Sequence, residues 1–155
     1  MNEILKNKTS LLGVKAGDVL PRSAWHAVTQ SAINQFADAT GDHQWIHVDP
    51  DKCKSHSPFG VPIAHGFMTA SMIPAAFDDV LADDPAIQSV INYGIDKLRF
   101  LEAVRVNDEI AFNFTVSEIK QKSTGKLIKT QVNGIIRETG KKALAGEFLM
   151  LVISE

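Results

Sequence analysis

The chain has 155 residues, of which 45% are hydrophobic and 22% charged, and this composition predicts one globular domain over residues 1–155. A net charge of -2 and a pI near 6.2 give no broad basic field, which argues against nucleic acid as the main partner. Cys53 is the only cysteine, and neither an apolar N-terminal run nor a long apolar stretch occurs, so we expect a cytoplasmic protein without disulfides or membrane insertion.

The first predicted elements are an extended segment over residues 18–29 and a helix near 30–39. Thr29 or Ser31 can cap this helix, and its apolar residues recur at the spacing of one helical face. Gly41 then supplies a natural stop. Asp42 is therefore predicted to begin a loop.

The middle of the chain changes character twice. Residues 48–62 contain three prolines and a glycine, which predicts an irregular or briefly helical segment that packs as a lid or wall. Residues 66–81 carry apolar side chains on nearly every side of a helix, which predicts burial all round. Pro74 inside this helix predicts a kink or a shorter first segment.

The remaining chain has the period-two pattern of strands. Residues 110–116 and 128–136 alternate apolar with polar or small residues, with turns at 123–125 and 139–140. Further strands are expected near 89–101 and 142–153. The predicted architecture is α+β, with an antiparallel sheet of four or five strands curved around the central helix. An uncovered sheet face or edge predicts a homodimer.

The candidate chemistry lies in the segment F-A-D-A-T-G-D-H-Q-W-I-H-V-D. Asp42 and His47 are five positions apart and would lie roughly 140° apart on a continuous helix, so they converge only if the chain bends between them. Gly41 makes such a bend plausible. A carboxylate beside an imidazole can move protons to and from water. The alternative is structural, with Asp42 capping a turn and His47 a satisfied histidine.

Other assignments of the polar residues remain open. His43 and His47 are four apart, and Asp42, Asp49, His56 and His65 lie nearby, so a metal site is conceivable, although the loop-like sequence argues against the helix that this spacing needs. The lysines late in the chain are expected at solvated strand ends, with phosphate binding as the minor alternative. They are Lys120, Lys122, Lys126, Lys129, Lys141 and Lys142. No nucleophile elbow, P-loop or dinucleotide fingerprint is present.

Gly66 follows His65 where a proline-bearing segment meets the predicted buried helix. A free N–H at a helix start favours negative charge, and glycine permits close approach, so Gly66 can bind an oxyanion. Tight packing at the start of the helix is the structural alternative.

At this point the motifs G-D-H-Q-W-I-H-V-D-P, P-F-G, A-H-G-F-M-T and I-N-Y-G-I-D-K-L-R-F resemble the MaoC-like (R)-specific enoyl-CoA hydratase family, in particular its nodulation protein N-like branch. The similarity spans roughly residues 20–153. It implies the hotdog fold, which is a long helix wrapped by an antiparallel sheet, usually in a dimer.

The resemblance also implies roles. Asp42 and His47 match the catalytic dyad of the family, and Gly66 matches its oxyanion-hole glycine. Gln44-Trp45 stands where many members have Asn-Pro, and Pro74 replaces a serine whose hydrogen bond Ser71 or Asn92 could supply. The further substrate-binding candidates are Gln44, Trp45, Phe59, His65, Phe67, Asn92 and Tyr93.

The implied activity is reversible, (R)-specific hydration of a trans-2-enoyl thioester of coenzyme A, or of an acyl carrier protein, without metal or other cofactor. Lys97, Arg99 or the late lysines could meet the phosphates of the carrier. A hotdog thioesterase and a non-catalytic acyl-thioester-binding protein are the alternatives.

Overall fold

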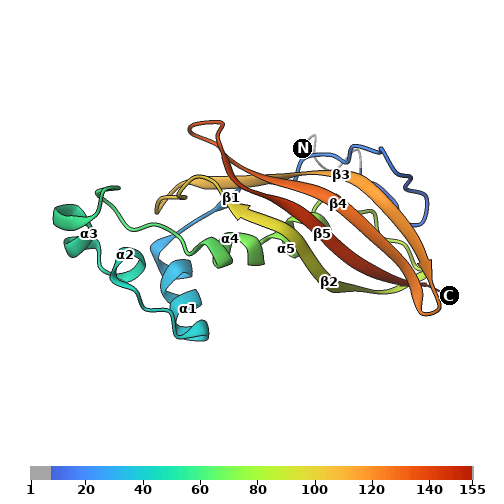
Figure 1. The fold of residues 1–155 in the computed structure, drawn as a ribbon, viewed down its shortest axis with the longest axis horizontal. Coiled ribbons are helices and arrows are strands. Elements are labelled where there is room, and N and C mark those ends of the chain that lie inside the picture. The colour runs from blue at the N-terminus through green and yellow to red at the C-terminus, as the bar shows by residue number, and fades with distance from the viewer. Residues whose placement is uncertain (1–7, 155) are drawn as a thin grey trace.

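The computed structural model describes residues 8–154, and in that part of the chain it contains five helices and five strands (Figure 1). Residues 1–7, which include most of the N-terminal segment expected to lack an export signal, and residue 155 lie outside the described part. The elements are β1 (His26–Ala27), α1 (Gln30–Thr40), α2 (Trp45–Val48), α3 (Pro50–His56), α4 (Gly66–Ser71), α5 (Ile73–Asp78), β2 (Ile87–Phe100), β3 (Glu109–Lys122), β4 (Gly125–Ile136) and β5 (Lys142–Ser154).

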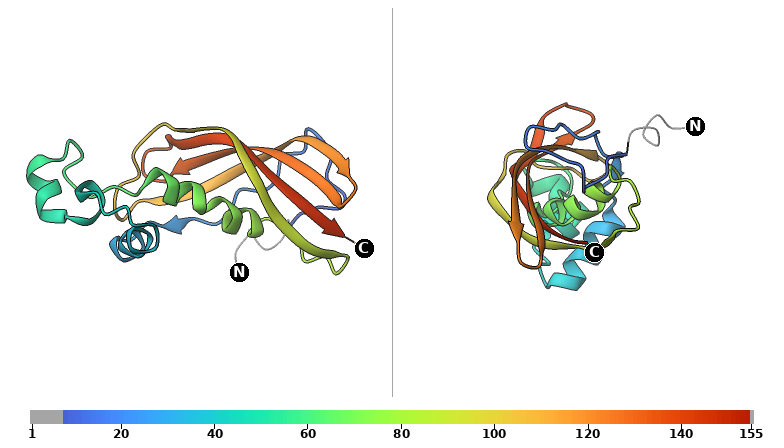
Figure 2. Two further views of the ribbon diagram at one scale, coloured as in Figure 1. Left: turned by 60° about the horizontal axis from the view of Figure 1, so that its bottom comes forward. Right: turned by 90° about the vertical axis from the view of Figure 1, so that its right-hand side faces the viewer.

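The strands form one antiparallel sheet in the order β1-β3-β4-β5-β2, which confirms the predicted sheet. Phe112 and Phe114 are fully buried on β3, as the alternating pattern predicts. The sheet curls around α4 and α5, and the end-on view of Figure 2 shows these helices enclosed by strands. Phe77 of α5 packs edge-on against Phe114 and Phe148, with ring centroids 5.0 and 5.8 Å apart, so the core lies between the helices and the sheet.

The central helix is interrupted, as Pro74 predicts. Met72 ends α4 and caps α5, and Pro74 lies in the first turn of α5, where its missing N–H breaks no helical hydrogen bond. The prediction that this helix is buried all round is wrong within a single chain. One stripe is exposed because the curled sheet leaves that side open; it consists of Phe67, Ser71, Ala75 and Asp78.

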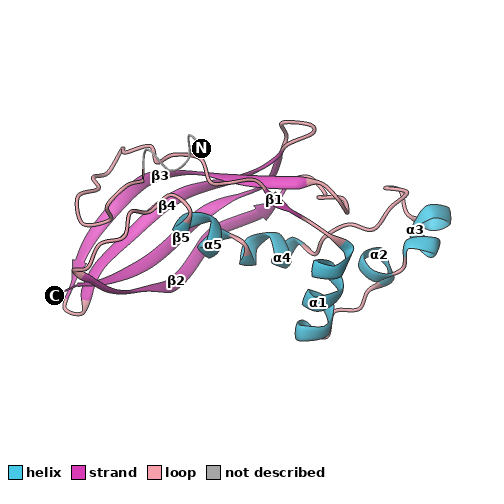
Figure 3. Ribbon diagram, turned by 180° about the vertical axis from the view of Figure 1, so that it is seen from behind, coloured by secondary structure: helices cyan, strands magenta, loops and turns pink. Residues whose placement is uncertain are grey.

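Helices α1 to α3 extend beyond one end of the sheet (Figures 1 and 3). The Thr29 side chain accepts a hydrogen bond from the N–H of Ala32 and so caps α1. Gly41 ends the helix in the left-handed region, with φ 83°, and its N–H donates to the Ala37 carbonyl. Both predictions about α1 are confirmed, and the turn at Gly41 directs the chain towards α2.

Strand β2 forms one edge of the sheet, paired only with β5. Nearly all its residues are exposed, including large apolar side chains. Those above about a third exposed are Val90, Ile91, Tyr93, Ile95 and Phe100. The described residues of one chain therefore leave a long apolar edge uncovered, next to the exposed stripe of α4 and α5.

Candidate functional site

Asp42, His47 and His65 converge where α1, α2 and α4 meet. Each offers one oxygen or nitrogen, and these three atoms lie within 4.8 Å of one another. Asp42 is exposed in the loop after Gly41, whereas His47 on α2 and His65 before α4 are only 6% and 3% exposed. The predicted convergence of Asp42 with His47 is thus present, and His65 is the third member.

His47 is held by the main chain. Its Nδ1 lies 2.6 Å from the carbonyl oxygen of Ile63, and because a carbonyl only accepts, Nδ1 must carry the proton. The neutral ring therefore has an unprotonated Nε2. Burial lowers the pKa of His47 below 6.5; the hydrogen bond to Ile63 opposes this shift, His65 adds to it and Asp42 opposes it. His47 is consequently poised as a neutral hydrogen-bond acceptor.

His65 contacts both members of the pair. Its Nε2 donates to the main-chain carbonyl of Asp42 at 2.8 Å, and its ring stacks on that of His47 with centroids 3.8 Å apart and planes 25° apart. Phe36 of α1 lies against the His65 ring, with the two centroids 5.0 Å apart. The remaining nitrogen, Nδ1, is buried and has no hydrogen-bond partner among the described residues.

Gly66 is the first residue of α4, so its N–H has no acceptor within the helix. A Cβ at this position would lie 2.7 Å from the Phe100 ring, closer than real contacts allow. The structural alternative raised from the sequence, tight packing at the start of the helix, is therefore confirmed. This packing is compatible with an oxyanion role, because Gly66 is only half-buried beneath the Phe100 ring.

Two cavities lie beside α4. The larger, of about 430 Å³, is lined by the predicted residues Phe67, Asn92 and Tyr93 together with Ser71 and Pro74. Phe148 of β5 and, from β2, Ile95 and Leu98 add to its apolar lining. The second, of about 240 Å³, is lined by Gly66 and Phe100 among others. Neither of these two cavities is lined by Asp42 or His47.

The other predicted substrate-binding residues lie on the helical extension. Gln44 is exposed, and its N–H donates to Asp42 Oδ1 at 3.3 Å. Trp45 is half-buried beneath the Lys52 ammonium, which lies 4.9 Å from the ring centroid. Phe59 is half-buried in the turn after α3 and lines neither of the two cavities. The structure brings Gln44 to Asp42 and leaves Phe59 apart from Phe67 and Tyr93.

The residues that could bind a metal differ from the pair His43 and His47 that the sequence spacing suggested. His43 turns away from His47, because its Nε2 contacts Asp38 at 2.8 Å, and this contact raises the pKa of His43. The residues that could coordinate an ion are instead Asp42, His47 and His65. Their two imidazoles are stacked, so the nitrogen lone pairs lie in nearly parallel planes. This orientation suits ring packing better than convergence on one tetrahedral ion.

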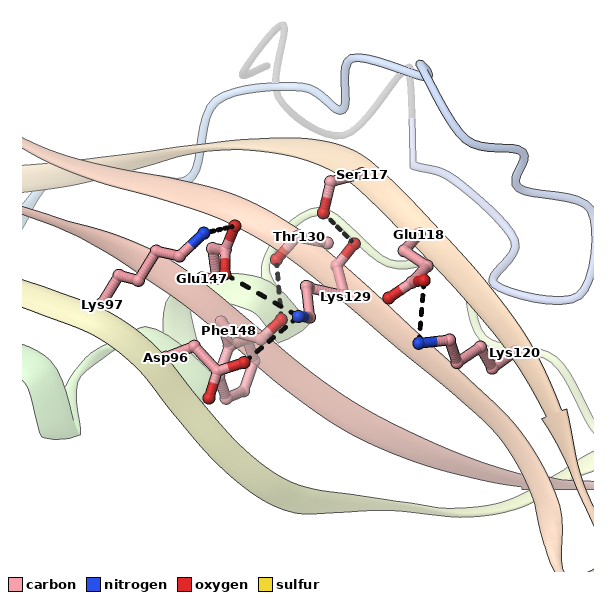
Figure 4. A network of polar contacts seen from close by, with 9 residues as sticks. All are labelled: Asp96, Lys97, Ser117, Glu118, Lys120, Lys129, Thr130, Glu147 and Phe148. Carbon is pink, nitrogen blue, oxygen red and sulfur yellow. Dashed lines mark hydrogen bonds and ion pairs between the residues drawn. The ribbon is translucent and has the colours of Figure 1, made fainter.

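The lysines considered for phosphate binding lie mostly in ion pairs on the outer face of the sheet (Figure 4). Lys129 contacts Asp96 at 3.1 Å and Glu147 at 3.8 Å, and Lys97 contacts Glu147 at 3.3 Å. The hydrogen bond to Asp96 is the main cause that raises the pKa of Lys129. These contacts favour the solvated-strand interpretation.

Sequence reasoning missed two groups of the site. The Ile63 carbonyl that fixes His47 carries no side-chain signal. Phe100, which covers Gly66, was noted only as the end of the motif K-L-R-F. The signal that could have found Phe100 is a large apolar residue near the end of an edge strand, where little core remains to bury it.

A family model described as the MaoC-like domain matches residues 13–138, which is most of the chain. The chain belongs to the MaoC-like domain family. It is 33% identical over 144 residues to 3-hydroxyacyl-thioester dehydratase Z of Mycobacterium tuberculosis, covering 92% of this chain and 94% of that protein. It is 35% identical over 153 residues to nodulation protein N of Rhizobium meliloti, covering 97% and 92%.

Solved structures agree. The MaoC-like dehydratase from Rhodospirillum rubrum superposes with a TM-score of 0.74 at 25% identity, covering 95% of this chain and 98% of that one. R-hydratase PhaJ1 from Pseudomonas aeruginosa gives 0.75 at 22% identity, covering 93% and 85%. The fold is thus the hotdog fold, as the resemblance implied, and this MaoC-like protein is an enzyme of the hydratase and dehydratase class.

Proposed function

We propose that this MaoC-like protein catalyses the reversible, (R)-specific hydration of trans-2-enoyl-CoA to 3-hydroxyacyl-CoA. The observation that carries the proposal is the placement of the Asp42 carboxylate within 4.8 Å of His47, whose Nδ1 is bound to the Ile63 carbonyl. Two acceptors at such a separation can share one water, since each hydrogen bond spans about 2.8 Å.

In the proposed mechanism this water donates one hydrogen bond to Asp42 and one to His47 Nε2. As its oxygen bonds to the β-carbon, one proton passes to the dyad, and the double-bond electrons move towards the thioester carbonyl. The dyad then delivers a proton to the α-carbon, so the product differs from the substrate by one water. The lowered pKa of His47 keeps the ring neutral and able to accept.

The charge that develops on the thioester oxygen needs a donor, and we assign this role to the Gly66 N–H. Loss of one donor in an oxyanion site typically costs about 3 to 4 kcal/mol of barrier. Phe67, Asn92 and Tyr93 would line the acyl chain in the 430 Å³ cavity, with Ser71 or Asn92 supplying a polar contact beside Pro74. Gln44 and Trp45 would frame the dyad side of the site.

The carrier is coenzyme A or an acyl carrier protein, and we propose that no metal or other cofactor is needed, because the dyad and Gly66 together supply base, acid and oxyanion donor. The free, buried thiol of Cys53 suits the proposed cytoplasmic location. Among the described residues, no helix has both the length and the apolar character that crossing a membrane requires.

We further propose a homodimer in which a second copy covers β2 and the exposed stripe of α4 and α5. The larger cavity lies between these two surfaces, since Phe67 and Ser71 come from α4 and Tyr93 from β2. A two-fold related copy would pair β2 with β2, which satisfies both edges at once.

The test is an assay of purified protein with crotonyl-CoA that follows loss of the enoyl absorbance and release of free thiol in parallel. Asp42→Asn and His47→Asn should each reduce enoyl loss roughly 100- to 10,000-fold. Release of thiol would favour the thioesterase alternative, and no reaction across several chain lengths would favour the binding protein. Enoyl loss that neither substitution affects would refute the assignment of the dyad.

A chelator provides the control for the cofactor proposal. Dialysis against EDTA should leave the rate of enoyl loss unchanged. Activity that is lost on dialysis and restored by Zn²⁺ would instead favour the cluster of Asp42, His47 and His65 as a metal centre.

A further inference from the structure

His65 presents no polar atom to a substrate. The residue is 3% exposed, its Nε2 is engaged by the Asp42 carbonyl, and its Nδ1 is buried without a partner among the described residues. The role in substrate binding that the sequence suggested therefore needs another explanation. A phenyl ring would fill the same space without burying an unpaired nitrogen, so packing alone does not account for an imidazole here.

What the imidazole adds is a donor aimed at Asp42. The other hydrogen bonds that involve this residue are longer: its N–H lies 3.4 Å from Thr40 Oγ1, and its Oδ1 lies 3.3 Å from the N–H of Gln44. Both come from the same exposed loop. The 2.8 Å bond from His65 instead crosses 23 residues of sequence and ties this loop to the buried start of α4.

The ring face of His65 supplies the second restraint. It stacks on the face of the His47 ring and so restrains its tilt. The hydrogen bond from His47 Nδ1 to the Ile63 carbonyl restrains the rotation of the same ring within its plane. His65 also precedes Gly66 in the chain. One side chain thus contacts both members of the dyad and is covalently joined to the oxyanion donor.

We propose that His65 is a positioning residue that sets the distance and orientation between Asp42 and His47. The proposal rests on the hydration proposed above. It predicts that losing either restraint slows the chemical step and leaves substrate binding nearly unchanged, because misplacing a reacting group by about 1 Å can cost on the order of 100-fold in rate.

Two substitutions separate the restraints. His65→Phe keeps a ring against His47 and removes the donor to Asp42, whereas His65→Gln keeps an amide donor within reach and removes the ring. Each should lower kcat for crotonyl-CoA roughly 10- to 100-fold with KM within about twofold. His43→Gln is the matched control: this loop histidine contacts Asp38, and its replacement should leave kcat unchanged. A raised KM with unchanged kcat, or unchanged kcat in both variants, would overturn the proposal.

A readout without substrate separates this proposal from the proposed reaction. In histidine-labelled protein, nitrogen chemical shifts should show a proton on His65 Nε2 and on His47 Nδ1 in the wild type. His65→Phe should shift the backbone amide resonances of the Asp42 loop, because it removes the hydrogen bond to the Asp42 carbonyl. If wild type fails to hydrate any enoyl thioester but these shifts occur, the reaction is wrong and the positioning stands. A proton on Nδ1 of wild-type His65, or Asp42-loop resonances that His65→Phe leaves unmoved, would refute the positioning.

Discussion

At the scale of single residues, burial sets the acid-base behaviour of His47. Its folded pKa lies below 6.5, so the folded protein binds this proton less readily than the unfolded chain does. The contribution of His47 to stability is complete above its unfolded pKa near 6.5 and is lost as the pH falls from there towards the folded pKa. Lowering the pH therefore protonates His47 and, in the same range, lowers the free energy of unfolding.

We accordingly expect kcat/KM of the wild type to decrease at acid pH, with the midpoint of that decrease below pH 6.5. Urea unfolding of wild type and His47→Gln at pH 5 and pH 7.5 checks the stability part. The wild type should lose more stability between these values than the variant, which lacks the titrating ring. An equal loss in both proteins would contradict the assignment.

Gly66 makes a second prediction at this scale. Gly66→Ala brings a methyl group to 2.7 Å from the Phe100 ring, and because that ring is 44% exposed it can shift. We expect a modest loss of stability, about 1 to 3 kcal/mol, and a larger loss of activity as the N–H moves.

The double variant Gly66→Ala with Phe100→Ala tests the cause. If the clash is responsible, the double variant should be more stable than the sum of the two single changes predicts, as measured by denaturant unfolding. Strict additivity would show that Phe100 is not the obstacle.

The sequence could suggest that Asp42 and His47 converge, because their residue types and the break at Gly41 are local signals, whereas the dyad role came from the family resemblance. It offered His65 as a possible metal ligand or substrate contact but could not place its ring against His47, because the stacking depends on where α4 begins relative to α2. That relation is tertiary, and the contact joins residues 18 positions apart. Likewise, Phe59 has the right chemistry for an acyl wall, yet its turn lies at neither cavity.

At the scale of elements, the end of α1 determines where Asp42 lies. The sequence predicts the cap of this helix at Thr29 and its stop at Gly41, and it also predicts the break at Pro74 and the turn between β3 and β4. The sequence did not predict that one stripe of α4 and α5 is exposed in a single chain. An apolar sequence indicates that a surface must be covered, but it does not indicate which chain covers it.

The turn at Gly41 offers a test of this placement of Asp42. Gly41→Ala places a Cβ at φ 83°, where no neighbouring atom lies within 4 Å, so the effect is backbone strain alone. We expect a loss of about 1 to 2 kcal/mol in unfolding free energy and a lower kcat as Asp42 shifts. Gly41→Asn, which tolerates the left-handed region, is the matched control and should lose less of both. Equal effects of the two substitutions would contradict a strain mechanism.

At the scale of the whole molecule, the uncovered surface is concentrated on one side. Tyr93 and Ile95 of β2 line the larger cavity together with Phe67, which is 69% exposed, and Val90 and Ile91 extend the exposed apolar edge along the strand. A long apolar edge strand is a template for pairing with another chain. Pairing with a second copy satisfies this edge, whereas a charge placed on it should oppose the pairing.

We therefore expect sedimentation velocity to give twice the mass of one chain for the wild type and a monomer for Ile91→Arg. Ile91 is 47% exposed and belongs to neither the dyad nor the proposed acyl wall, so lost activity in this variant would report the missing partner. Val19→Arg is the matched control, because Val19 is 76% exposed beside β3, near the opposite edge of the sheet. The dimer should survive that change. A monomeric wild type with full activity would contradict this prediction, because it would show that one chain forms the complete site and that activity does not depend on pairing at β2.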